Sequence, residues 1–291
     1  AMLSQVVNPV IYQSGYGEDE PDEPPPQDPV TYITGSELRD TSLSCDYLIV
    51  THEDFFSTAA LDEFANYRAE YNNLSIVIAK VDDIYTQFSG PGTRYRDRNN
   101  SQDGAIKMFV RHAYYNWGIQ YLLIVGDVEY VPSHYQVQVH RWGEVIDYEE
   151  WYTCVSGEDE WPDLAMGRFS VKDQNHLRSI HGKILSYEHP DDYNWRALYV
   201  EGNGMSPDQG IIDLLRNVGF DVTELYTNGG NDRQDLINAI NLGQNFVHWH
   251  GHGSTDAWAC IGFLKCDIAR LNNFSSYPII FAESCSTADL D

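Results

Sequence analysis

The stretch Asn245-Phe-Val-His-Trp-His-Gly-His-Gly-Ser254 joins a short apolar run to a glycine-rich turn, and a second apolar run, Tyr277-Pro-Ile-Ile-Phe-Ala282, ends just before Ser284 and Cys285. Two such runs predict neighbouring strands of one sheet. Functional groups on parallel α/β sheets gather beyond the carboxyl ends of the strands. We therefore expect His252 and Cys285, which are 33 positions apart, to lie together at one edge of a sheet.

An imidazole beside a thiol indicates a site for nucleophilic attack on a carbonyl group. A free thiol is a poor nucleophile near neutral pH, and a neighbouring imidazole can take its proton or hold it as thiolate. The backbone N–H groups of Gly253 and Cys285 are candidates for the two donors of an oxyanion hole, because glycine allows a close approach of the backbone. The two segments together contain the groups that acyl transfer needs.

The chain before these segments alternates between apolar strands and amphipathic helices, as in βαβ units. Strands are predicted at 47–50, 75–79, 121–125 and 164–166, and helices at about 57–71, 101–117 and 173–187. Residues 133–155 break this rhythm, and the period-two pattern of Tyr135-Gln-Val-Gln-Val-His140 predicts a hairpin or a protruding loop. We expect a parallel sheet with helices on both faces.

A second α/β unit is predicted towards the end of the chain, with strands at 197–200, 221–225, 245–248 and 278–282 and helices at about 208–218 and 232–242. The expected organisation is an acidic, Pro-rich linker over 1–41, a first subdomain over 42–190 and a second over 191–291. The predicted fold class is α/β, with mostly parallel sheets flanked by helices in two packed subdomains. A length of 291 residues with 42% hydrophobic content is sufficient for such a core.

The formal net charge of −26 restricts the partners of the chain. Nucleic acids and anionic membrane surfaces are polyanions that would be repelled, so we expect neither. Clustered carboxylates favour a hard cation such as calcium. No apolar run is long enough to span a membrane. The start, Ala1-Met2-Leu3, does not resemble a signal peptide, so an export signal is expected upstream.

Four segments resemble, in order, the catalytic domain of gingipain-type cysteine peptidases, which are relatives of caspases and legumains. They are Tyr121-Leu-Leu-Ile-Val-Gly-Asp-Val-Glu-Tyr-Val-Pro132, Gly157-Glu-Asp-Glu-Trp-Pro-Asp-Leu-Ala-Met-Gly-Arg-Phe-Ser170, residues 245–258 and Pro278-Ile-Ile-Phe-Ala-Glu-Ser-Cys285. The resemblance implies a caspase-like fold and a secreted cysteine endopeptidase, made as a zymogen, that cleaves proteins or peptides. It also implies structural calcium and no cofactor for the chemistry.

The resemblance implies further roles for acidic residues. The family carries an acidic residue immediately before the strand at 164–166, which assigns Asp163 to orienting the imidazole of His252; such a carboxylate fixes the tautomer and supports the imidazolium. Relatives hold a basic P1 side chain with an acidic residue, but the corresponding position here is Gln174 or His176, with Asp173 displaced from it. Asp173 is therefore the candidate for substrate binding, and arginine or lysine is the expected P1 residue.

Two other interpretations of the site remain. His248, His250 and His252 alternate along one strand and, with Asp256 nearby, would suit a zinc metallohydrolase. The resembling proteins are not consistently histidine at the first two positions, which favours packing or hydrogen bonding for those rings. The other alternative is a non-catalytic, peptidase-like binding module for carbohydrate or adhesion. Retention of both His252 and Cys285 argues against it.

The five cysteines, Cys45, Cys154, Cys260, Cys266 and Cys285, are odd in number and lack CxxC spacing, so at least one thiol is unpaired. The resembling proteins continue well beyond their cysteine, whereas six residues follow Cys285 here. Either processing yields a second chain that supplies the remainder, or the sequence is shortened. We favour a second chain from processing.

Overall fold

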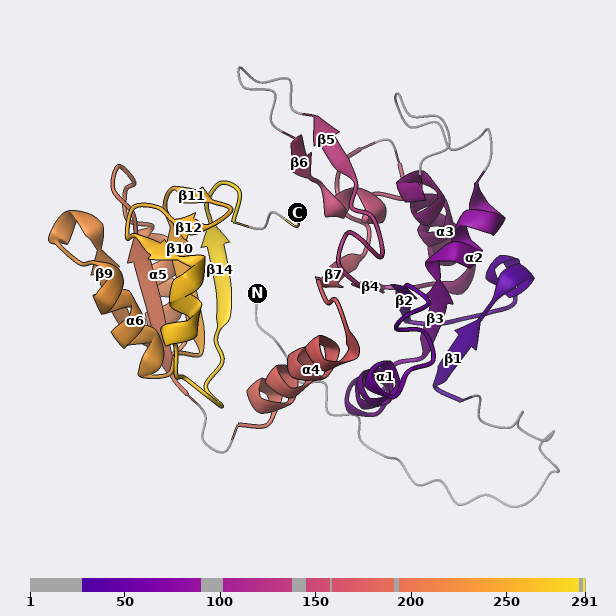
Figure 1. Ribbon diagram of the computed structural model, residues 1–291, viewed down its shortest axis with the longest axis horizontal. Coiled ribbons are helices and arrows are strands. Elements are labelled where there is room, and N and C mark those ends of the chain that lie inside the picture. Colours follow the sequence, from indigo (N-terminus) through magenta and orange to yellow (C-terminus); the bar gives the residue numbers. More distant parts are fainter. Residues whose placement is uncertain are drawn as a thin grey trace, which may run out of the picture.

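The computed structural model describes residues 28–89, 102–137, 145–157, 159–190, 194–287 and 290. Figure 1 shows two sheets flanked by helices, with helix α4 (Gln174–Glu188) between them along the chain. The larger sheet is built from residues 30–169 and the smaller from residues 196–283. The predicted α/β class with parallel sheets flanked by helices is confirmed. In the described part, no helix is long and apolar enough to cross a membrane.

The first sheet has five strands in the order β1-β3-β2-β4-β7, and all neighbouring strands are parallel. They are β1 (Val30–Ile33), β2 (Tyr47–Thr51), β3 (Ile76–Lys80), β4 (Tyr121–Val125) and β7 (Ala165–Phe169). Successive side chains of a strand point to opposite faces, so Leu48 joins the core on one face and Ile49 the core on the other. The central strands are thus apolar on both faces, as in other parallel sheets.

Helices cover both faces of this sheet. They are α1 (Ala59–Asn72), α2 (Val81–Phe88), α3 (Gln102–Trp117) and α4, with the 3-10 helices η1 (Gly35–Arg39) and η2 (Glu149–Thr153). Helices α2 and α3 pack on the face of Leu48, whereas α1 and α4 pack on the face of Ile49. An antiparallel hairpin, β5 (Tyr135–Val137) with β6 (Val145–Asp147), lies where the sequence breaks the βα rhythm. Helices on both faces and the hairpin were both predicted.

Strand β1 and helix α2 are two of the elements that the sequence prediction missed. The predicted linker over 1–41 includes β1, which pairs with β3 and buries Ile33, so the folded body begins before residue 42. The rest of that linker up to residue 27 lies outside the described residues. Helix α2 was not predicted, and its buried side is only Val81, Ile84 and Phe88. Two turns of helix give too few residues for the helical period to stand out.

A buried arginine ties the end of β4 to β7 and η2. The Arg168 side chain is 5% exposed and donates to both carboxylate oxygens of Glu149, at 2.6 Å each. It also donates to the backbone carbonyls of Gly126, Val131 and Pro132, at 2.7, 2.8 and 3.3 Å. One planar guanidinium thus fixes the loop that follows β4.

The second sheet has four parallel strands in the order β14-β10-β8-β9. They are β8 (Arg196–Glu201), β9 (Asp221–Tyr226), β10 (Phe246–His250) and β14 (Ile279–Glu283). Helix α6 (Arg233–Asn241) packs on the face that contains Val247 and Trp249, and α5 (Gln209–Asn217) contacts β9. The strands and helices predicted for this half are all present.

The connection from β10 to β14 forms its own small structure. It contains the antiparallel strands β11 (Gly253–Ser254), β12 (Ala257–Trp258) and β13 (Phe263–Leu264), followed by the 3-10 helix η4 (Lys265–Arg270). One further 3-10 helix, η3 (Thr227–Gly229), follows β9. Because β11 starts directly after His252, this small sheet sets the direction in which the chain leaves β10.

Replacing Arg168 with lysine should destabilise the protein by about 3 kcal/mol, because an ammonium group cannot reproduce the planar fork and leaves buried acceptors unpaired. Urea unfolding followed by circular dichroism measures the change in the free energy of unfolding. Arg178→Lys, on the exposed side of α4, is the matched control and should change it by less than about 0.5 kcal/mol. Equal effects of the two substitutions would contradict the role of Arg168.

Candidate active site

The candidate site lies where β10 and β14 end. The two strands pair in parallel, and their last pair is His250 with Glu283. The N–H of Gly251 then donates to the carbonyl oxygen of Glu283 at 3.2 Å. Because both strands end at the same level, the segments that carry His252 and Cys285 begin side by side.

Gly253 brings these two segments into contact. A Cβ atom at this position would lie 2.4 Å from the carbonyl oxygen of Cys285, 2.5 Å from Cγ2 of Thr287 and 2.7 Å from Oγ of Ser284. Side-chain carbons do not approach a backbone oxygen so closely, so only glycine fits between the segments. The backbone next to His252 therefore packs directly against the backbone of Cys285.

The N–H of Gly253 is not used by the small antiparallel sheet. The N–H of Ala259 donates to the carbonyl oxygen of His252 at 2.8 Å, which makes these two residues a hydrogen-bonded pair. Such pairs alternate with non-bonded pairs along an antiparallel ladder, and the next pair is Gly253 with Trp258. The N–H of Gly253 therefore points away from β12.

Two stacked indoles hold the segment after His252 on the core. Trp249 in β10 and Trp258 in β12 have ring centroids 5.3 Å apart and planes only 5° from parallel. Trp249 is fully buried, and a Cβ at Gly251 would lie 2.5 Å from its ring. The two glycines beside His252 are thus needed for different reasons, since Gly251 makes room for an indole and Gly253 for the cysteine segment.

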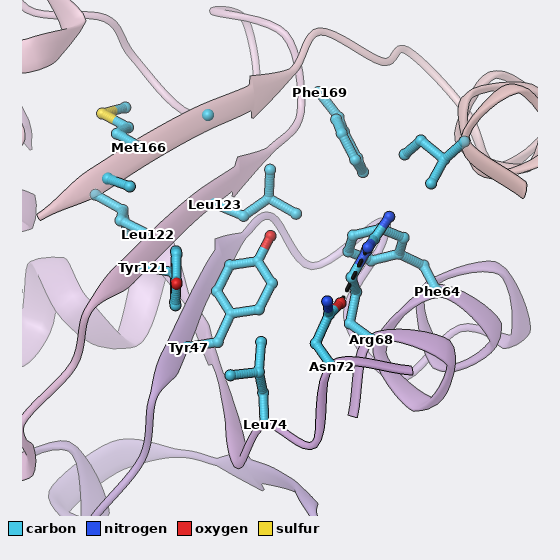
Figure 2. A pocket seen from close by; sticks show the side chains of 13 residues that line it. Tyr47, Phe64, Arg68, Asn72, Leu74, Tyr121, Leu122, Leu123, Met166 and Phe169 are labelled. Atoms are coloured by element: carbon cyan, nitrogen blue, oxygen red, sulfur yellow. Dashed lines mark hydrogen bonds between the residues drawn. The ribbon is translucent and has the colours of Figure 1, made fainter. Parts of the chain in front are cut away.

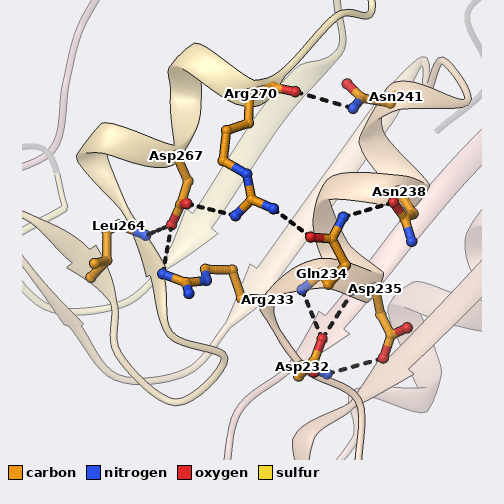
Figure 3. Close-up of polar contacts among 9 residues, drawn as sticks. All are labelled: Asp232, Arg233, Gln234, Asp235, Asn238, Asn241, Leu264, Asp267 and Arg270. Carbon is orange, nitrogen blue, oxygen red and sulfur yellow. Dashed lines mark hydrogen bonds and ion pairs between the residues drawn. The ribbon is translucent and has the colours of Figure 1, made fainter.

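A buried carboxylate fixes the connection to β14 on α6, as Figure 3 shows. Asp267 is 3% exposed, and its Oδ2 accepts the N–H of Leu264 at 2.9 Å. Its carboxylate also lies 3.0 Å from Nη1 of Arg270 and 3.4 Å from Nη1 of Arg233. The Leu264 N–H first, and then the guanidinium groups, hold the pKa of Asp267 below its usual range. Helix η4 is therefore anchored by charge as well as by packing.

The side chains of His252 and Cys285 are both exposed, so a substrate in solvent can reach them. Behind them, Glu201 at the end of β8 and Glu283 at the end of β14 occupy register positions on either side of His250. Sequence reasoning did not single out these two glutamates. The signal for Glu283 was its place two residues before the cysteine, where strand alternation puts it on the same face as Phe281.

The histidine run does not form a metal site in the structure. The rings of His248 and His250 have centroids 6.4 Å apart, and His248 packs between Tyr199 and Phe281, 5.3 Å from each. Among the described residues, no three His, Cys, Asp or Glu side chains are arranged to hold a metal ion. The geometry therefore gives the zinc interpretation no ligand set.

Asp163 lies just before β7, at the amino end of the first sheet's edge strand. Its Oδ2 accepts the N–H groups of Val155 and Ser156, at 2.8 and 2.7 Å. None of its hydrogen bonds within the described residues reaches His252. The structure thus gives the carboxylate a local role in the turn, and the orienting role stays a prediction.

Asp173 caps the amino end of α4. Its Oδ1 accepts the N–H of Asn175 at 2.7 Å and that of His176 at 2.9 Å, as an N-cap aspartate does. These bonds explain why an aspartate occurs at this position without reference to substrate. Its predicted part in substrate binding has no contact in the structure to support it.

The first sheet carries a pocket of about 510 Å³ between α1, α4 and the strands β4 and β7, shown in Figure 2. Its lining is mostly apolar, and its one arginine, Arg68, bonds Asn72 at 3.0 Å and Glu188 at 2.9 Å. The lining includes no histidine, cysteine, aspartate or glutamate. This pocket therefore lacks a nucleophile and a base, unlike the edge of the second sheet.

The sequence matches peptidase family C25 over residues 40–291, and the chain belongs to that family. Gingipain R2 of Porphyromonas gingivalis is 27% identical over 202 residues, which is 64% of this chain and 26% of the relative. Gingipain R1 of the same organism is also 27% identical over 202 residues, or 20% of its length. The chain thus spans about a quarter or less of these relatives.

Solved structures show the same fold. The Arg specific cysteine proteinase gingipain R (RgpB) superposes with a TM-score of 0.69 at 22% identity, over 84% of this chain and 55% of that chain. The complex of Porphyromonas gingivalis RgpB pro- and mature domains gives a TM-score of 0.68 at 23% identity, over 82% and 55%. The predicted caspase-like fold of a gingipain-type domain is confirmed.

Replacing Gly253 with alanine should reduce the peptidase activity that we propose for the chain by about 100-fold or more, because the new methyl group displaces the Cys285 backbone and misplacements of about 1 Å have such effects. Turnover of a peptide substrate measures the loss. Gly182→Ala is the control, since a Cβ at this α4 position meets nothing within 4 Å. If Gly253→Ala retained the activity of the control, the contact between the segments would not matter for the site.

Replacing Asp267 with asparagine should lower the melting temperature at neutral pH by more than it does in acid. A carboxyl with a lowered folded pKa stabilises the protein above its unfolded pKa, of about 3.9, and this stabilisation is lost as the pH falls through the folded value. Thermal unfolding between about pH 3 and about pH 7 measures the difference. Asp221→Asn, exposed at the start of β9, is the control. A difference that does not vary with pH would show that the charge of Asp267 is unimportant.

Proposed function

We propose that the chain acts in a cysteine endopeptidase, with Cys285 as nucleophile and His252 as general acid and base. The observation that carries this proposal is the contact of the two segments through Gly253. Membership of peptidase family C25 supports it. The Cys285 thiolate attacks the scissile carbonyl, His252 passes the thiol proton to the leaving amine, and water then hydrolyses the thioester.

The N–H groups of Gly253 and Cys285 are the proposed donors to the oxyanion. Gly253 suits this role because its N–H is not engaged with β12 and its backbone touches that of Cys285. Donors held in place by the fold stabilise the developing charge without reorganising in the reaction. Asp163 is proposed as the orienting carboxylate on the family resemblance alone.

We propose arginine or lysine as the P1 residue, with arginine favoured by the likeness to the Arg specific gingipain R. Glu201 and Glu283, at the strand ends beside the site, supply negative charge that attracts a cationic side chain. The sequence predicts Asp173 for this role, but its Oδ1 already accepts two backbone N–H groups at the start of α4. Protein and peptide substrates follow from this chemistry.

The proposed function is tested by labelling with an arginine chloromethyl ketone under reducing conditions with calcium. Intact mass should show one adduct, which Cys285→Ala abolishes and Cys266→Ala, at another exposed thiol, does not. Hydrolysis of an arginyl peptide should fall by about 1,000-fold or more in Cys285→Ala. Labelling that persists in Cys285→Ala would contradict the assignment of the nucleophile, and the absence of any adduct on the assembled protein would favour a non-catalytic module.

We also propose that a second polypeptide, produced by processing of a zymogen, covers β14. Ile279, Ile280 and Phe281 are 52%, 50% and 55% exposed, although alternate residues face opposite sides of the sheet. An edge strand that is apolar on both exposed faces is prone to aggregate unless something covers it. Intact mass and N-terminal sequencing of active protein test this, and an active, folded sample without a second polypeptide would contradict it.

Structural calcium and secretion are proposed on the same family resemblance. The net charge of −26 is consistent with a bound cation, and calcium accepts backbone carbonyl oxygens, so it does not need three acidic side chains together. The described residues point to no particular set of ligands. Addition of calcium after chelation should raise the melting temperature if such a site exists, and an unchanged melting temperature would contradict it.

A further inference from the structure

Glu283, the last residue of β14, contacts β10 and the residue that follows it through both its backbone and its side chain. Its carbonyl oxygen accepts the N–H of Gly251 at 3.2 Å, and its Oε2 lies 3.7 Å from Nε2 of His248 in the middle of β10. Cys285 follows two residues later. Glu283 is therefore linked to β10 both through the backbone that leads to His252 and through a side chain deeper in the sheet.

His248 is an unusual residue for the middle of this strand. It is fully buried, and neither ring nitrogen has a hydrogen-bond partner among the described residues. Tyr199 and Phe281 pack beside the ring on the two flanking strands and fix its orientation. A buried polar group without a partner costs free energy, so an apolar residue would pack here more favourably. Because Nε2 of His248 points towards the Glu283 carboxylate, the imidazole has a role at this position other than packing.

The charges around His248 define how this contact responds to pH. Burial lowers the pKa of His248, Glu283 and Asp208 act to raise it, and His250 acts to lower it. Tyr199, whose hydroxyl contacts Glu201 at 3.4 Å, also packs against the ring. The ring is therefore neutral near neutral pH and becomes charged as the pH falls, which strengthens its attraction to Glu283.

We propose that Glu283 is a positioning residue for Cys285, held by His248. The pair fixes the end of β14 against β10, so that the thiol stays beside the segment of His252. At 3.7 Å the contact is electrostatic rather than a hydrogen bond, so it depends on the charge of the carboxylate. This inference rests on the proposed function in one respect, namely that the reactivity of Cys285 is what the pair controls.

The test is the rate at which iodoacetamide alkylates Cys285 in the full chain, followed by peptide mass mapping over a range of pH. Glu283→Gln should slow alkylation by roughly 3- to 10-fold and change the shape of the rate–pH profile. His248→Phe keeps an aromatic ring between Tyr199 and Phe281 and should have the same effect. The double variant should be no slower than either single variant, because both remove one interaction.

Glu224→Gln is the matched control, since it removes a carboxylate from β9, which lies two strands away from β10. It should leave the alkylation profile unchanged. The melting temperature of each variant shows whether it is folded, and His248→Phe provides a second route if Glu283→Gln is not. A folded variant of either kind that alkylates within about twofold of the wild type at every pH would overturn the inference.

Hydrolysis of an arginyl peptide is measured in parallel. If the positioning inference holds, kcat falls in His248→Phe while KM changes little, because the buried His248 holds the nucleophile and does not meet the substrate. If the wild type alkylates with the expected dependence on Glu283 but hydrolyses no peptide, the proposed function fails and the positioning inference stands. Failure of the proposed function can therefore be distinguished from failure of the positioning inference.

Discussion

The parallel pairing of β10 with β14 in a single register is the constraint on which the candidate site depends. A slip of one residue would turn every side chain of β10 to the opposite face, so that His248 would enter the core beside α6 and Trp249 would leave it. The stack of Trp249 on Trp258 and the fit of Gly251 against the indole both oppose such a slip. The core of the sheet therefore fixes the level at which the histidine and cysteine segments leave their strands.

Each half of the chain uses one buried charge to hold a connection in place. In the first half, the Arg168 guanidinium donates hydrogen bonds to five acceptor oxygens. In the second half, the Asp267 carboxylate accepts the N–H of Leu264 and pairs with two guanidinium groups. A buried charge is tolerated when its neighbours pair it completely, and it is costly when one of them is lost. Both residues hold segments that follow or connect strands, where the backbone lacks the hydrogen bonds between strands that stabilise a sheet.

The sequence predicts those parts of the structure in which local pattern and tertiary packing agree. The predicted strands stand out as continuous apolar runs and the larger helices as long segments between them, and the meeting of residues 252 and 285 follows from the rule that parallel strands end at one edge. Strand β1 and helix α2 are too short for their patterns to stand out from their surroundings. The local roles of Asp163 and Asp173 were missed for a different reason. Each carboxylate accepts backbone N–H groups whose positions are set only when the turn or the helix has folded. Glu283 and Glu201 become part of the site only through the register of three strands.

The pair of parallel indoles next to His252 gives this site an optical property of its own. Trp249 and Trp258 lie close enough for their electronic transitions to couple, and their near-parallel planes make that coupling sensitive to small rotations of the segment after β10. Of the seven tryptophans in the chain, these two stack on each other across the glycine turn. Near-ultraviolet circular dichroism of the resting protein therefore reports on the packing of the histidine segment without substrate, inhibitor or label.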